Sequence, residues 1–314
     1  MPYELEPVQF QSDGHRISAL LSFPVGAGPH PCIVMAGGWC YVKELAQPLY
    51  ARVFNQQGLA TLIIDYRHLG ASEGEPRQHI DPWRQIDDYR NAISFAETLS
   101  QVDARRIGAW GISYSGGHVL ILGALDERVR AISSIVPVVD GYESMRLSHG
   151  TLGFRRLRSA LKEARRLRCE TGELTYLPHQ PVQEGEVATW PFPQSRITFT
   201  RLRETQAPAY EGRATAESTE MLLAYSVWPF LQRLIATPTL MVVAEGDDHT
   251  HWDLAAKAFA AIPGVRKRFH VVPKATHLTL YEDAETVTAV AELAAGWFNK
   301  NLARPEASDI RAPA

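Results

Sequence analysis

Short apolar runs alternate along most of the chain with longer stretches in which apolar residues recur every three or four positions. Continuous apolar runs are typical of strands that are buried on both faces of a parallel sheet. The stretches between them have the spacing of amphipathic helices. This alternation predicts an α/β fold, with a mostly parallel sheet that is flanked by helices.

The predicted elements can be given as residue ranges. The expected strands are residues 7–12, 17–24, 31–39, 60–67, 106–113, 129–140, 237–247 and 268–276. Helices are expected up to Arg52 and over 83–99, 118–125, 252–262 and 284–301. The first two strands are separated by Asp13-Gly14, which is a typical signal for a hairpin turn.

The alternation stops after Asp140 and resumes at Ala236. Between them the chain holds a basic helical stretch, a passage rich in proline and polar residues, and further helical spacing. We therefore predict a core formed by residues 1–140 and 236–303, interrupted by a mainly helical cap over 141–235. Residues 304–314 are expected to be a disordered tail.

Composition and charge narrow the function classes. The 314 residues are 45% hydrophobic and 21% charged, with a net charge of −3, which suits a globular protein and gives no reason to expect nucleic acid as a partner. Three cysteines form no spaced framework, and no apolar run approaches the roughly 18 residues that span a bilayer. With no signal-peptide pattern at its start, the chain is expected to be cytoplasmic, without membrane contact.

A strand-to-turn-to-helix junction carries the first candidate for chemistry. In RIGAWGISYSGGHVL, glycine and serine crowd the turn that follows a buried strand. A nucleophile at such a turn needs small neighbours two positions before and after it. Both Ser113 and Ser115 meet this condition, but Ser113 follows the strand directly. We therefore expect Ser113 to be the nucleophile.

The junction and one further motif resemble a known family. Residues Gly111–Gly116 match a G-x-S-Y-x-G elbow, and Leu62–Arg77 is similar to a D-Y-R-G-x-G-x-S-x-G loop in which His68 replaces a glycine. Both are found in α/β-hydrolases of the group that includes dienelactone hydrolases and the X-Pro dipeptidyl-peptidase/cocaine-esterase type. The resemblance covers most of residues 8–140 and 236–300, and implies an α/β-hydrolase fold.

Acyl transfer places negative charge on a carbonyl oxygen, which backbone N–H groups stabilise in an oxyanion hole. The residue after the nucleophile, Tyr114, is expected to supply one donor. The second is expected from Trp39, in the glycine-rich loop after an early strand. Related enzymes commonly have histidine where this chain has Gly37.

The remaining triad members are expected later in the chain, in the order acid and then histidine. The resemblance selects Asp247, three residues past the small residue that ends a strand, with Asp248 as the alternative. His277 follows about thirty positions later, in the loop after another strand. His249 and His251 form an H-x-H pair, but we predict no metal site because no third ligand accompanies them.

The cap offers candidates for substrate contact. The helix FRRLRSALKEARRLR carries seven basic residues, which are either a solvated face or a rim for an acidic substrate or a phosphate-bearing carrier. Trp190 and Trp228 from the cap, together with Tyr41, are candidates for lining an apolar substrate pocket.

These residues predict a serine hydrolase that needs no cofactor and cleaves a carboxylic ester, lactone or thioester of a small-molecule acyl substrate through an acyl-enzyme. Hydrolysis of a carbon–carbon bond and acyl transfer to another acceptor are alternatives that use the same residues. A non-catalytic ligand-binding protein on this fold is an alternative of another class. Association into a homodimer is a further expectation.

Overall fold

The computed structural model describes residues 3–303. Its main sheet has eight strands: β1 (Glu6–Ser12), β2 (His15–Ser22), β3 (His30–Ala36), β4 (Ala60–Ile64), β5 (Val102–Ile112), β6 (Val129–Ile135), β9 (Thr239–Ala244) and β10 (Lys267–Val272). The spatial order is β1-β2-β4-β3-β5-β6-β9-β10. β1 and β2 form an antiparallel hairpin at Asp13-Gly14, β2 runs antiparallel to β4, and all other pairs are parallel. This is an α/β-hydrolase fold, as predicted.

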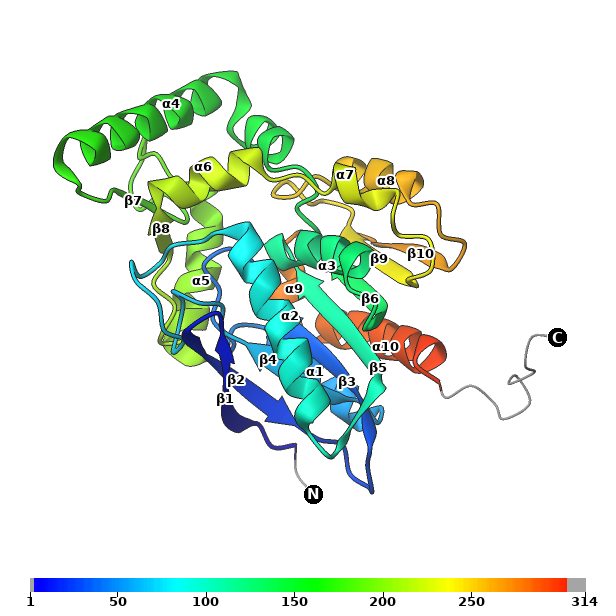
Figure 1. Ribbon diagram of the computed structural model, residues 1–314. Helices are drawn as coiled ribbons and strands as arrows, with labels where there is room; N and C mark the ends of the chain where they lie inside the picture. Colours follow the sequence, from blue (N-terminus) through cyan, green and yellow to red (C-terminus); the bar gives the residue numbers. More distant parts are fainter. Residues whose placement is uncertain (1–2, 304–314) are drawn as a thin grey trace.

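Helices cover both faces of the sheet. They are α1 (Gln47–Gln56), α2 (Pro82–Thr98), α3 (Tyr114–Leu125), α8 (Trp252–Ala261), α9 (Thr279–Glu282) and α10 (Ala284–Asn301). α1 packs against α10, while α2 packs against α3. In Figure 1, α2 and α3 lie in front of the sheet and α10 lies behind it. The carboxyl ends of the parallel strands meet at one edge, where ligand sites of such sheets form.

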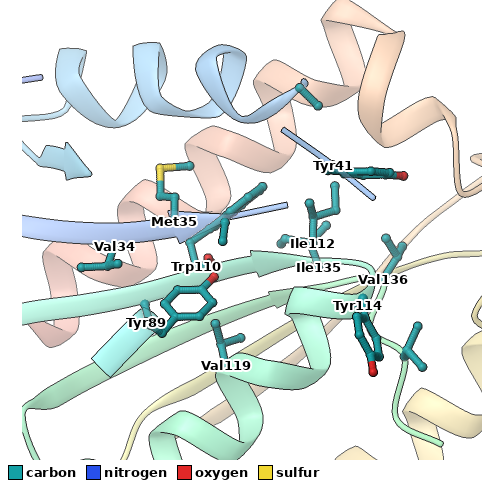
Figure 2. Packing of buried hydrophobic residues seen from close by; sticks show 14 of the residues in the cluster. Val34, Met35, Tyr41, Tyr89, Trp110, Ile112, Tyr114, Val119, Ile135 and Val136 are labelled. Atoms are coloured by element: carbon teal, nitrogen blue, oxygen red, sulfur yellow. Dashed lines mark hydrogen bonds between the residues drawn. The ribbon is translucent and has the colours of Figure 1, made fainter. Parts of the chain in front are cut away.

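The apolar core lies between these layers. Val34, Met35, Trp110 and Ile135 are fully buried, and Figure 2 shows them on neighbouring strands with Val119 of α3 below. Strand β5 lies in the middle of the sheet, between β3 and β6. Its carboxyl end is therefore held on both sides by packed, hydrogen-bonded strands, which makes it a rigid support for a functional group.

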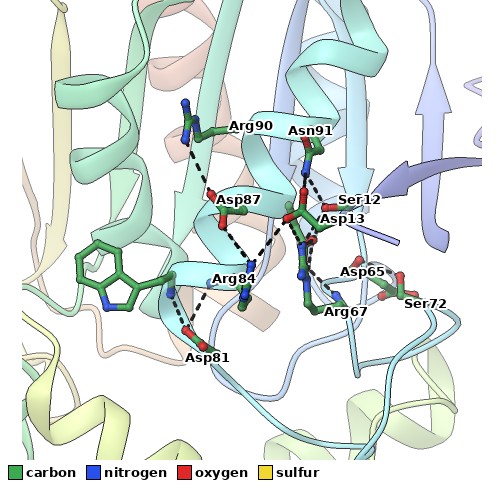
Figure 3. Close-up of polar contacts among 12 residues, drawn as sticks. Ser12, Asp13, Asp65, Arg67, Ser72, Asp81, Arg84, Asp87, Arg90 and Asn91 are labelled. Carbon is green, nitrogen blue, oxygen red and sulfur yellow. Dashed lines mark hydrogen bonds and ion pairs between the residues drawn. The ribbon is translucent and has the colours of Figure 1, made fainter. Parts of the chain in front are cut away.

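A buried polar network fastens the β1–β2 hairpin and the loop after β4 to helix α2 (Figure 3). Asp88 accepts hydrogen bonds from the Arg67 side chain at 2.7 and 2.9 Å and from the Ser12 hydroxyl at 2.6 Å. Asp81 caps the same helix by accepting from the backbone N–H groups of Trp83 and Arg84. Arg67 and Asp88 are buried and bonded to each other, so removing either side chain would leave the other as an uncompensated buried charge.

The segment of residues 141–235, between β6 and β9, adds no strand to the main sheet. It contains α4 (Gly141–Thr171), β7 (Tyr176–Pro178), α5 (Pro193–Thr205), β8 (Arg213–Thr215), α6 (Ala216–Ala224) and α7 (Trp228–Leu231). α4 packs on α6 at the top of Figure 1 and is kinked at Gly150, whose φ is +60°. On the basic face of α4, Arg165 pairs with Glu220 and Arg166 with Glu163 and Glu170.

The structure shifts several predicted boundaries. The helix expected over 118–125 begins at Tyr114, and the strand expected over 129–140 ends at Ile135. The strand that was expected to reach Asp247 ends at Ala244, because the chain turns there to place polar side chains at the sheet edge. The predicted tail, 304–314, lies outside the described residues. Within residues 3–303, no helix is both long and apolar enough to cross a membrane.

Candidate active site

Ser113 lies at the sharp turn between β5 and α3. Its backbone has φ +58° and ψ −115°, a strained conformation for a residue other than glycine. The turn requires glycine nearby: a Cβ at Gly111 would collide with the carbonyl of Ser115, and a Cβ at Gly117 would collide with the carbonyl of Val138. The local sequence therefore dictates an elbow that holds the Ser113 hydroxyl above the sheet edge.

Three residues from separate loops meet at this elbow. The Ser113 Oγ lies 3.2 Å from His277 Nε2, and His277 Nδ1 lies 2.8 Å from Asp247 Oδ2. Their exposed fractions are 4% for Ser113, 2% for His277 and 6% for Asp247. Asp247 follows β9, and His277 follows β10. The structure thus brings together the three residues that were predicted as a triad.

Asp247 is held as a carboxylate. Its Oδ1 accepts from the backbone N–H groups of His249 and Thr250, both at 2.9 Å, and its Oδ2 accepts from the Thr250 hydroxyl at 2.8 Å. Burial raises the pKa of Asp247, but its electrostatic interaction and hydrogen bond with His277, together with His249 and the Thr250 N–H, outweigh burial and hold the pKa well below its usual range. A permanent negative charge beside Nδ1 fixes the proton of His277 on that nitrogen.

The neighbouring carboxylate, Asp248, has a different environment. Its side chain is 54% exposed and bonds to His249 Nδ1 at 2.6 Å. Asp247, Asp248 and His249 each offer one metal-ligand atom within 4.8 Å of one another. However, the Asp247 oxygens already accept four hydrogen bonds, and His251 points its Nε2 toward Ser148 at 3.2 Å. The H-x-H pair therefore does not converge on one point.

The glycine-rich loop after β3 lies against the nucleophile. A Cβ at Gly38 would be 2.9 Å from Ser113 Cβ, so only glycine allows this approach. The backbone N–H of Trp39, the next residue, belongs to the same loop. Tyr114 begins α3, and the first N–H groups of a helix have no partner within it. Tyr114 is thus the next residue after Ser113 in the chain, and Trp39 follows the glycine that lies against Ser113 in space.

Two side chains brace this loop. The Ser115 hydroxyl, fully buried under the elbow, donates to the carbonyl of Gly37 and lies 2.5 Å from the Tyr66 hydroxyl. Asp65 accepts from the backbone N–H of Lys43 at 2.6 Å and from its ammonium at 2.8 Å. Asp65 is the aspartate of the D-Y-R motif, and its bonds to Lys43 connect the loop after β4 to the candidate oxyanion loop after β3.

The predicted pocket residues have different positions. Tyr41 is buried beside the triad, with its ring 5.5 Å from that of Tyr281. Trp190 is buried in the cap, 6.1 Å from the ring of His249. Trp228 lies on α7 with 36% of its surface exposed. Contact of these three with substrate stays a prediction.

Sequence reasoning missed Tyr281 altogether and considered His249 only as a metal ligand. The His249 ring stacks on that of His277, with centroids 4.9 Å apart, and its Nε2 bonds to Ser195 of the cap at 2.8 Å. The Tyr281 hydroxyl lies 3.3 Å from His277 Nε2. No local pattern pointed to Tyr281, because His277 lies in the loop before α9 and not in the same helix.

Comparisons with known proteins show which proteins this chain resembles. The family model described as X-Pro dipeptidyl-peptidase (S15 family) matches residues 13–279. The chain is 40% identical to the quorum-quenching protein AidA of Acinetobacter baumannii (strain MDR-ZJ06), over 44% of this chain and 45% of that protein, so this match spans less than half of each.

Other relatives match over more of their length. The chain is 29% identical to the thiohydrolase aneE of Aspergillus aculeatus over 77% of each protein, and 30% identical to the acyltransferase drtE of Aspergillus calidoustus over 89% of this chain and 90% of that one. The structure of the alpha/beta hydrolase GrgF from Penicillium sp. sh18 superposes with a TM-score of 0.79 at 22% identity, covering 96% of this chain and all of that one.

Proposed function

We propose that this chain, which belongs to the X-Pro dipeptidyl-peptidase (S15) family, cleaves a carboxylic ester, lactone or thioester with Ser113, His277 and Asp247 as its catalytic triad. The observation that carries the proposal is the continuous row of bonded groups from Ser113 Oγ through His277 to Asp247, at 3.2 and 2.8 Å. Such a row is what an activated serine requires.

In the first half of the reaction, Ser113 Oγ attacks the acyl carbon and its proton passes to His277 Nε2. Asp247 stabilises the imidazolium that forms, while the N–H groups of Trp39 and Tyr114 stabilise the negative oxygen. The bond to the leaving group then breaks, and the Nε2 proton moves to the leaving oxygen or sulfur. The acyl group remains on Ser113.

In the second half, a water molecule takes the place of the leaving group beside His277. Nε2 accepts a proton from this water as its oxygen attacks the acyl carbon, and the same proton returns to Ser113 Oγ when the acid departs. The triad is then restored. Besides the substrate and water, this proposal uses only groups of the chain.

A substrate panel with one acyl chain tests the substrate class. The same acyl group is supplied as a p-nitrophenyl ester, an alkyl ester and an acyl-thioester, and an X-Pro p-nitroanilide is tested beside them. We expect turnover of the esters and the thioester by the wild-type protein, and its loss in Ser113→Ala. Turnover of the anilide with the esters and thioester left intact would contradict the proposed substrate class.

Acyl transfer is the second candidate function. It is supported by the relative that is named an acyltransferase, which matches 89% of this chain. A small alcohol added to the ester assay separates the two activities. Hydrolysis predicts that the free acid remains the main product, whereas acyl transfer predicts that the alcohol ester replaces it.

Location and assembly are further proposals. The three cysteines are free thiols in the structure, two of them buried, which fits the reducing conditions of the cytoplasm. A homodimer is proposed as the solution state, and a mass measurement at micromolar concentration tests it. A mass of one chain would contradict the dimer.

A further inference from the structure

A second hydroxyl lies at the reacting nitrogen of His277. Tyr281 Oη is 3.3 Å from His277 Nε2, and Ser113 Oγ is 3.2 Å from the same nitrogen. Tyr281 belongs to the short helix α9, which begins two residues after His277, and its side chain is fully buried. Its hydroxyl therefore touches the group that moves the proton.

His277 Nε2 cannot accept hydrogen bonds from the Tyr281 and Ser113 hydroxyls at full strength at the same time. The Nδ1 proton is bonded to Asp247, so Nε2 of the neutral ring has one lone pair for two hydroxyl donors. Once Ser113 is bonded to the acyl carbon, Nε2 carries a proton and no longer accepts. The hydroxyl of Tyr281, which also has the hydroxyl of Tyr41 and the Oγ of Ser113 as neighbours, is then free to donate to a substrate atom beside Nε2.

The leaving atom of the substrate is the acceptor at that place. It takes the proton from Nε2 and must therefore lie within hydrogen-bond distance of that nitrogen. We propose that Tyr281 is a further catalytic residue, whose hydroxyl donates a hydrogen bond to the leaving atom as the acyl bond breaks. The inference rests on the proposed hydrolase function.

Acylation exchanges one bond of the acyl carbon for another and moves one proton. The bond between Ser113 Oγ and the acyl carbon forms, the bond from that carbon to the leaving atom breaks with its electron pair, and the Nε2 proton moves to the leaving atom. Tyr281 keeps its own proton throughout and only stabilises the growing negative charge. In deacylation the same hydroxyl contacts the attacking water.

The surroundings of Tyr281 suit a donor. Burial raises the pKa of the phenol well above its ordinary value, and the nearby Tyr41 raises it further, so that the hydroxyl stays protonated. The ring is packed edge-to-face on Tyr41 at 5.5 Å. The carbonyl of Leu280, its neighbour in α9, accepts a hydrogen bond from the Tyr50 hydroxyl at 2.8 Å, which anchors the helix to α1.

The test compares Tyr281→Phe with the wild type on esters of one acyl chain that differ in the basicity of the leaving alcohol. A p-nitrophenolate ion leaves without help, whereas an alkoxide needs a donor. We expect Tyr281→Phe to slow the alkyl esters by roughly 10- to 100-fold and the p-nitrophenyl ester by less than about threefold. The dependence of kcat/KM on leaving-group basicity becomes correspondingly steeper.

Tyr50→Phe is the matched control, because it removes a buried hydroxyl that bonds to the Leu280 carbonyl of α9 and not to Nε2. It should leave the dependence on leaving-group basicity unchanged. Active sites are titrated with a fluorophosphonate, so that all rates refer to folded enzyme. An equal loss on every ester in Tyr281→Phe would overturn the inference while leaving the hydrolase function standing; a wild-type protein that cleaves no ester or thioester would overturn both.

A second variant keeps the test independent of folding. If Tyr281→Phe does not fold, fluorotyrosine at position 281 retains the shape and gives a more acidic, stronger donor. The alkyl esters should then react faster relative to the p-nitrophenyl ester than in the wild type. An unchanged ratio would overturn the proposed donation to the leaving atom.

Discussion

At the scale of single residues, two aspartates that are adjacent in the chain have opposite environments. Asp247 is buried and bonded to His277, whereas the side chain of Asp248 is half exposed and bonded to His249. We expect Asp247→Asn to lower kcat by about 10³- to 10⁴-fold, because the amide no longer fixes the Nδ1 proton. Asp248→Asn is the control and should keep most of the activity. Steady-state kinetics on the p-nitrophenyl ester measures both, and the reverse ranking would assign the role to Asp248.

The order of the candidate triad along the chain could be predicted, but its supporting side chains could not. Ser113, Asp247 and His277 each follow a recognisable strand, so that their place at one sheet edge follows from topology. His249 was considered only as a metal ligand. Its stacking on His277 depends on how the loops after β9 and β10 lie together, and its bond to Ser195 depends on how residues 141–235 pack against them; no local pattern specifies either.

At the scale of elements, the loop after β3 has no room for a side chain at position 38. A Cβ at position 38 would lie 2.9 Å from Ser113 Cβ, so that the loop must move in Gly38→Ala and carry the Trp39 N–H away. Loss of one oxyanion donor lowers kcat by about 10²- to 10³-fold. We therefore expect Gly38→Ala to lose activity on this scale while circular dichroism shows an intact fold.

Gly296→Ala provides the matched control for that substitution. Gly296 lies within α10, where an added Cβ meets no atom within 4 Å and φ is not positive. Alanine in place of glycine in a helix interior should stabilise the protein by roughly 0.5–1 kcal/mol and leave kcat unchanged. Equal activity losses in the two variants would contradict the role of the loop.

Strand positions were predictable from apolar runs, whereas strand ends were not. The expected strand over 129–140 stops at Ile135 because the chain leaves the sheet to enter the cap, although the apolar pattern continues through Val139. Val136 still donates to the carbonyl of Val242 in β9, whereas Val139 accepts from the N–H of Val227 in the segment 141–235. Burial produces the same apolar pattern in both settings, so that periodicity alone does not separate them.

At the scale of the whole molecule, buried histidines make stability depend on pH. Burial lowers the pKa of His118 to about 3, well below its value in an unfolded chain. The unfolded state therefore binds a proton between about pH 6.5 and 3 that the folded state does not, so that stability is full above pH 6.5 and falls as the pH drops. Between pH 7.5 and 5.5, His118 alone should lower the free energy of unfolding by about 1.4 kcal/mol.

Urea unfolding of the wild type and of His118→Leu at these two pH values measures that contribution. The variant loses the bonds of His118 to Gln85 and Tyr225, so it is expected to be less stable at both pH values. The difference between the two pH values should nevertheless be smaller than in the wild type by about 1.4 kcal/mol. An equal difference in both proteins would show that His118 is not held neutral.

Mass spectrometry after treatment with a fluorophosphonate tests the central claim most directly. The reagent bonds covalently to a serine only where a base and an oxyanion hole activate that serine. The wild type and Ser115→Ala should each gain one adduct, found on the Ser113 Oγ after digestion, and Ser113→Ala should gain none. An unlabelled wild type, or a Ser113→Ala protein that still carries the adduct, would contradict the account.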